Sequence, residues 1–144
     1  MTKHKVNARW LGNRAFEGVV TGHKVVIDTP ADSGGDNKGP SPKQLMLLSL
    51  AGCTGIDVAL ILGKMKIELE DFNVIVEGEL TEENPKYYRH MHVIYEFTGN
   101  DLPYDKLKRA IDLSEQKYCG VSALYKKAID VTSEIRILTT AHGK

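Results

Sequence analysis

The chain has no excess of charge, because its 19 Lys and Arg residues balance 19 Asp and Glu residues over 144 positions. Proteins that bind nucleic acid through its phosphates usually carry a basic surplus, so we expect no nucleic-acid partner. Two cysteines are too few for a disulfide scaffold. The N-terminal residues lack the unbroken apolar run of a secretory signal. We therefore expect one soluble domain over residues 1–144 in the cytoplasm, where thiols stay reduced.

One segment, residues 45–62, is apolar enough to need a membrane test. It is at the short limit for a membrane span, and Asp57 near its centre would be costly in lipid, so we expect no membrane partner. Ser41 and Pro42 are typical of a helix start, which predicts a helix over residues 42–64. Apolar residues cover nearly the whole circumference of this helix. A helix of this kind must be buried on nearly all sides, and a second copy of the chain would bury it in a homodimer.

The rest of the chain alternates between strand and helix patterns. Residues 4–28 predict short strands joined by turns, and residues 29–41 form a loop rich in Gly, Pro and Asp. A hairpin over 71–98, helices within 103–127, a last strand over 130–138 and a frayed tail through Lys144 follow. In the return strand of the hairpin, one face is predicted to hold Met91, Val93, Tyr95 and Phe97. This order predicts an α+β fold, with antiparallel sheets around the long buried helix.

The two cysteines are the strongest candidates for chemistry. Cys53 lies inside the predicted helix between Gly52 and Gly55, and each helical glycine costs about 1 kcal/mol. Such costs suggest that another group approaches the backbone closely, although a free cysteine is also a common small core residue. Cys119 lies between the last two helices, and a helix start would favour its thiolate. The two thiols could form a reversible disulfide or be unrelated, because sequence separation does not fix their distance.

Other residues offer weaker signals. His90 and His92 share one strand face and could bind zinc, although outward histidines are more often solvated. Arg14, in the turn between the first two strands, could lower the pKa of a nearby thiol through its fixed charge. No phosphate-binding loop, serine-hydrolase elbow or zinc-protease motif is present.

Two long motifs add a resemblance that covers nearly the whole chain. GPSPKQLMLLSLAGCTGIDVALIL and LSEQKYCGVSALYKKAIDVTSEI resemble the two cysteine segments of the OsmC/Ohr family, the osmotically induced and organic hydroperoxide resistance proteins. The resemblance implies an intertwined homodimer that reduces organic hydroperoxides in oxidative-stress defence. Cys53 would be the peroxidatic cysteine, which becomes a sulfenic acid, and Cys119 the resolving cysteine, which closes a disulfide. A dithiol would then reduce this disulfide, with no metal or organic cofactor.

The same resemblance assigns roles around the thiol. Arg14 matches the arginine that activates the thiolate, with Arg9 as the alternative, while Gln44 and Leu48 would contact the substrate. Many family members hold this arginine with a Glu, but Lys43 and Gln44 occupy the corresponding positions here. That departure leaves a second hypothesis open, a non-catalytic module of the same fold that binds a hydrophobic small molecule or senses redox state.

Overall fold

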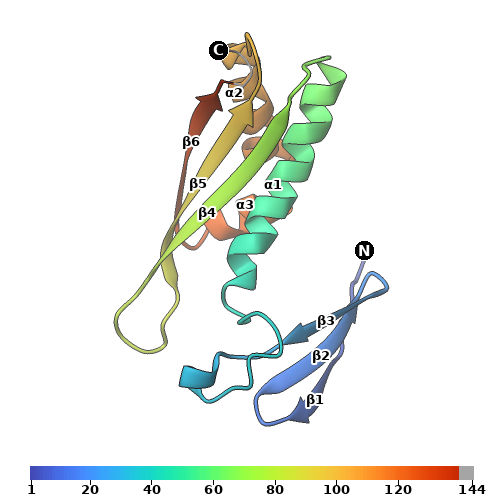
Figure 1. Ribbon diagram of the computed structural model, residues 1–144, viewed down its shortest axis with the longest axis vertical. Helices are drawn as coiled ribbons and strands as arrows, with labels where there is room; N and C mark the ends of the chain where they lie inside the picture. The colour runs from blue at the N-terminus through green and yellow to red at the C-terminus, as the bar shows by residue number, and fades with distance from the viewer. Residues whose placement is uncertain (140–144) are drawn as a thin grey trace. The chain divides into compact units, whose positions relative to one another are not determined.

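The computed structural model describes residues 1–139, and the predicted frayed tail over 140–144 lies outside them (Figure 1). Contacts divide the chain into two compact units, residues 1–46 and the residues from 47 onward. Each unit has its own three-stranded sheet. The hypothesis of a single domain over residues 1–144 stays a prediction.

The first unit is an antiparallel meander followed by an ordered loop. Its strands are β1 (Ala8–Gly12), β2 (Ala15–Val20) and β3 (His23–Ile27), and a 3-10 turn, η1, covers Ala31–Ser33. The buried carboxylate of Asp28 organises the loop by accepting backbone N–H bonds from Lys38, Thr29 and Asp36. These bonds hold the pKa of Asp28 below its usual value, and the bond from the Lys38 N–H has the largest effect. A loop rich in Gly and Pro is thereby given a defined path.

The second unit contains a mixed sheet in the order β4-β5-β6. Strands β4 (Asp71–Leu80) and β5 (Tyr88–Thr98) form the predicted antiparallel hairpin. Strand β6 (Asp130–Leu138) pairs with β5 in parallel, so the prediction of antiparallel pairing fails at this edge. The reason is the helical connection between β5 and β6, which is long enough to carry the chain back to the same end of the sheet.

Helices cover one face of this sheet (Figure 1). They are α1 (Leu45–Lys64), α2 (Tyr104–Leu113) and α3 (Gly120–Lys126), and a π-helical turn, η2 (Ser114–Tyr118), continues α2. The four residues predicted to share one face of β5 do so, and this face is buried, since each of them is at most 1% exposed. They pack against apolar residues of α1 and α2: Leu50, Val58, Leu62, Leu107, Ala110 and Ile111. The α+β class is therefore confirmed.

Helix α1 uses only one of its apolar faces within the described chain. Its buried positions recur every four residues, from Leu50 to Leu62. On the other side Leu48, Ile56 and Leu60 remain 65%, 71% and 58% exposed. Among residues 1–139, α1 is the single helix with the length and composition of a membrane span, a property that core helices of soluble proteins share. Its buried stripe is that of a core helix, and its exposed stripe is open to a further protein surface.

Candidate redox site

The fold brings the two cysteines together. The Sγ atoms of Cys53 and Cys119 and a carboxylate oxygen of Asp57 all lie within 4.8 Å of one another. Cys53 lies in the middle of α1 and is partly buried, whereas Cys119 is 2% exposed. Two thiols at this separation can form a disulfide after a small movement of their side chains.

The π-helical turn delivers Cys119 to this position. The backbone N–H of Cys119 donates to the Ser114 carbonyl oxygen at 2.7 Å, which closes the wide turn. Cys119 then leaves helical geometry and caps α3, where its Sγ accepts a bond from the Ser122 N–H at 3.3 Å. A π turn inside or beside an α-helix often marks a functional site.

The pKa of Cys119 is raised, whereas its position at a helix start was expected to lower it. Burial is the main cause that raises the pKa of this thiol to about 11, and a hydrogen bond with the neighbouring Cys53 thiol contributes to the same shift. The Ser122 N–H favours the thiolate but is outweighed. The expectation that the helix start would make Cys119 a thiolate is therefore wrong, because desolvation of a fully buried sulfur exceeds the effect of one backbone dipole.

Asp57 is the member of this cluster that the motifs did not single out. It follows Cys53 by four residues, so the two side chains lie on the same side of α1. The Ser114 hydroxyl donates to Asp57 Oδ2 at 3.0 Å. The sequence feature that could have identified Asp57 as a site residue is a carboxylate in a mostly apolar helix, one turn after a cysteine.

Buried hydroxyls extend this cluster away from the sulfur atoms. Ser114 Oγ lies 3.0 Å from Thr54 Oγ1, which lies 2.8 Å from the Tyr95 hydroxyl. The Tyr95 hydroxyl donates to Glu115 Oε2 at 2.7 Å, and Lys126 Nζ lies 3.6 Å from Glu115 Oε1. Burial is the main cause that raises the pKa of Tyr95, so this phenol stays protonated. The chain of bonds fixes η2 against α1 and β5.

The other predicted site residues are described within their own units. In the first unit, Arg14 donates from Nη1 to the Ser33 carbonyl oxygen at 2.7 Å, and Gln44 is exposed. Leu48 is exposed on α1. The roles that the resemblance assigns to Arg14, Gln44 and Leu48 stay predictions.

The histidine pair has partners within the sheet. His92 is bonded to Thr132 Oγ1 and Glu134 Oε1, each at 2.7 Å, and His90 to the same threonine oxygen at 2.9 Å. These contacts explain both histidines as polar residues on the outer face of β5. Near the thiols, residues 1–139 supply a cluster of three potential metal ligands, whereas a closed structural zinc site uses four.

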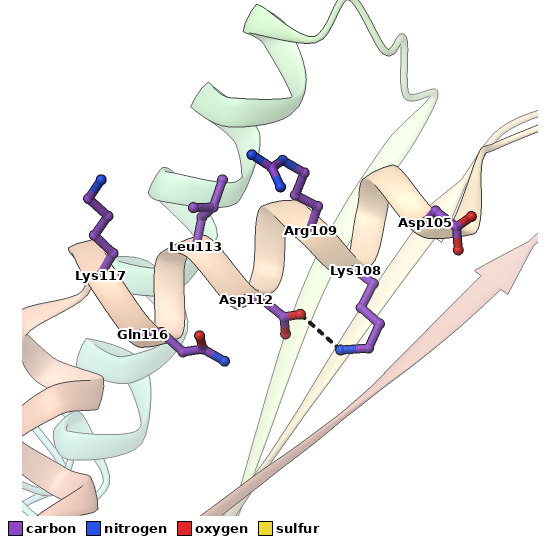
Figure 2. A pocket seen from close by; sticks show the side chains of 7 residues that line it. All are labelled: Asp105, Lys108, Arg109, Asp112, Leu113, Gln116 and Lys117. Carbon is purple, nitrogen blue, oxygen red and sulfur yellow. Dashed lines mark hydrogen bonds and ion pairs between the residues drawn. The ribbon is translucent and has the colours of Figure 1, made fainter.

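Two hollows lie on the helical side of the second unit. One, of about 590 Å³, is a groove along α2 and η2 whose lining is mostly charged, and a Lys108–Asp112 bond of 2.9 Å joins two of its lining residues (Figure 2). It contains neither thiol. The other, of about 500 Å³, is more apolar and reaches Asp57. Its remaining lining residues are Leu60, Ile61, Lys64, Leu113 and Tyr118.

These features define an α+β protein with two converging thiols, one partly buried and one fully buried. Residues 35–134 match the family model described as OsmC-like protein, and the chain belongs to this family. "Protein YhfA" of Escherichia coli strain K12 is 33% identical over 135 residues, which cover 93% of this chain and 98% of that protein.

Solved structures show the same fold. A hypothetical protein from Aquifex aeolicus VF5 matches with a TM-score of 0.85 and 26% identity, over 97% of this chain and 99% of that one. The organic hydroperoxide resistance protein OhrB of Bacillus subtilis matches with a TM-score of 0.63 and 22% identity, over 94% and 98% of the two chains. The OsmC-like fold expected from the cysteine motifs is therefore confirmed.

Proposed function

We propose that this protein is a thiol-dependent peroxidase that reduces organic hydroperoxides. The observation that carries the proposal is the convergence of Cys53 and Cys119 within 4.8 Å. The Cys53 thiolate attacks the O–O bond, an alcohol leaves, and Cys53 becomes a sulfenic acid. Cys119 then condenses with this sulfenic acid to form a disulfide and water. An external dithiol reduces the disulfide and returns both thiols, so the cycle needs no metal or organic cofactor.

Burial supports the order of the two cysteines. Cys53 is partly exposed and can meet a hydroperoxide, whereas the buried Cys119 can reach only a neighbouring group. Arg14 is the proposed activator of the Cys53 thiolate, and Gln44 and Leu48 the proposed substrate contacts, on the strength of the family resemblance. The name of the Bacillus subtilis neighbour, a hydroperoxide resistance protein, is in keeping with this chemistry.

We also propose that the protein acts as a cytoplasmic homodimer. The exposed apolar side of α1 carries Leu48, Ile56 and Leu60, and a second copy of the chain is the simplest surface to cover it. A reducing compartment would keep both thiols available between turnovers.

The test compares two variants that each keep one thiol. Reduced wild-type protein should consume many equivalents of cumene hydroperoxide in the presence of a dithiol. Cys53→Ser should lose nearly all of this activity. Cys119→Ser is the matched control, which should still consume one equivalent and form a sulfenic acid that dimedone traps. Activity that survives Cys53→Ser would refute the assignment.

The cavity beside Asp57 favours a second candidate, a module that binds an apolar small molecule. This cavity of about 500 Å³ is lined by Leu60, Ile61 and Leu113 together with polar residues. A binding module would consume at most one equivalent of hydroperoxide with every dithiol supplied. Multiple turnovers with any dithiol would exclude this candidate as the main function.

A further inference from the structure

The condensation of Cys53 with Cys119 requires one proton to be removed and one to be supplied, and the two sulfur atoms do not provide a group for either transfer. In the reaction Cys53–SOH + HS–Cys119 → Cys53–S–S–Cys119 + H₂O, the attacking sulfur loses a proton. The hydroxide that leaves Cys53 gains one. Cys119 has a pKa of about 11 because of its burial. Only about one molecule in ten thousand would hold this thiolate at pH 7 without help.

One carboxylate is placed to handle both transfers. An oxygen of Asp57 lies within 4.8 Å of the sulfur that loses the proton and of the sulfur that carries the leaving oxygen. A sulfenic oxygen on Cys53, or one water molecule, spans a gap of this size. The arrangement follows from the four-residue spacing on α1 and from the π turn that brings Cys119 to it.

The surroundings of Asp57 fix its orientation. The Ser114 hydroxyl donates to Oδ2 at 3.0 Å, and Ser114 is itself anchored by Thr54 Oγ1, also at 3.0 Å. Asp57 also lines a cavity of about 500 Å³, together with Lys64 and Tyr118. Ser114 is therefore a positioning residue for the carboxylate.

We propose that Asp57 is a catalytic acid–base residue of the resolving step. Its carboxylate accepts the proton of the Cys119 thiol as the sulfur attacks Cys53. The same proton then passes to the departing hydroxide, which leaves as water, and Asp57 ends the step as it began. The inference rests on the proposed peroxidase function for its first reaction, the formation of the sulfenic acid, and assigns a role to a residue outside the two cysteine positions.

The main experiment follows disulfide closure in single-turnover reactions with cumene hydroperoxide. Asp57→Asn keeps the size of the side chain and an acceptor for Ser114 but cannot take a proton. We expect closure to slow about 100-fold or more at pH 7, and dimedone to trap the accumulated sulfenic acid. Asp112→Asn, on α2 and bonded to Lys108, is the matched control and should close at the wild-type rate.

The pH profile separates catalysis from a merely structural role. With Asp57 present, closure should be nearly independent of pH around neutrality. In Asp57→Asn it should rise about tenfold per pH unit toward pH 11, because only thiolate already formed can attack. Cys53 and Cys119 belong to the same cluster as the carboxylate, and Lys64 and Tyr118 line its cavity. Tyr95 and Tyr125 interact electrostatically with Cys119. All of these ionisable groups are retained in this variant. Asp57→Glu should restore the flat profile.

A second reaction tests Asp57 without any peroxide. Methyl methanethiosulfonate converts the more exposed Cys53 to a methyl disulfide, and Cys119 displaces methanethiolate from it. The proton of the Cys119 thiol passes by way of Asp57 to the departing methanethiolate. Asp57→Asn should therefore slow the formation of the Cys53–Cys119 disulfide in this reaction too. If the wild type did not reduce hydroperoxide, the proposed peroxidase function would be wrong. The reaction with methyl methanethiosulfonate would still test whether Asp57 assists the attack by Cys119.

Three results would overturn the role of Asp57. They are an unchanged closure rate in Asp57→Asn, a slower rate with the wild-type pH profile, and a wild-type rate that itself rises tenfold per pH unit from 7 to 10. The third result is obtained with the wild-type protein alone, so it does not depend on whether a variant folds.

Discussion

The buried thiol of Cys119 predicts a specific loss of stability at alkaline pH. In the folded chain its pKa is raised from 9.0 to about 11, with desolvation as the main cause. Above pH 9 the unfolded chain therefore releases a proton that the folded chain still holds, so rising pH favours unfolding. The stabilisation is complete below pH 9 and is lost as pH rises toward 11. A difference of this size corresponds to about 2–3 kcal/mol.

Urea unfolding of the reduced protein at pH 8, 9, 10 and 11 measures this loss. Tyrosines and lysines also titrate in this range, so the comparison is with Cys119→Ala, which keeps them. The wild type should lose about 2–3 kcal/mol more than the variant between pH 8 and 11. Parallel stability curves for the two proteins would show that burial does not raise the pKa of this thiol.

Two further predictions concern packing. Gly78→Ala should destabilise the fold by about 1–3 kcal/mol in thermal or urea unfolding, because its Cβ would lie 2.6 Å from Tyr88 Cδ1 and 2.8 Å from Leu47 Cδ2. Gly63→Ala, whose Cβ meets nothing within 4 Å, is the matched control, and equal stability of both variants would contradict the argument. Ile56→Asp, at a position 71% exposed on α1, should convert a homodimer to single chains in sedimentation experiments. A wild type that already sediments as one chain would refute the proposed dimer.

Periodicity predicted those parts of the fold that depend on local pattern. Alternation along residues 88–98 identified the buried face of β5, because side chains in a strand point to opposite faces in turn. The apolar run before Lys64 identified α1, although it could not say which of its faces the sheet would cover. Pairing between distant strands was beyond local pattern, and the parallel partner of β5 was missed for that reason.

The candidate site was predictable in its residues and not in its arrangement. The two cysteine motifs, by their resemblance to a known family, singled out Cys53 and Cys119. Asp57 was read only as an obstacle to membrane insertion. Its place beside both thiols depends on how η2 packs against α1 through Ser114 and Thr54.

The sequence by itself determined the α+β class, the two cysteine segments and the long apolar helix, since all three are written in the order and spacing of side chains. Only the tertiary structure decided that the two sulfurs meet within 4.8 Å with a carboxylate beside them. It also showed that the pKa of Cys119 is raised, whereas the sequence had predicted a lowered pKa. The distance between residues far apart in the chain depends on the whole fold, and so does the water removed around a buried group.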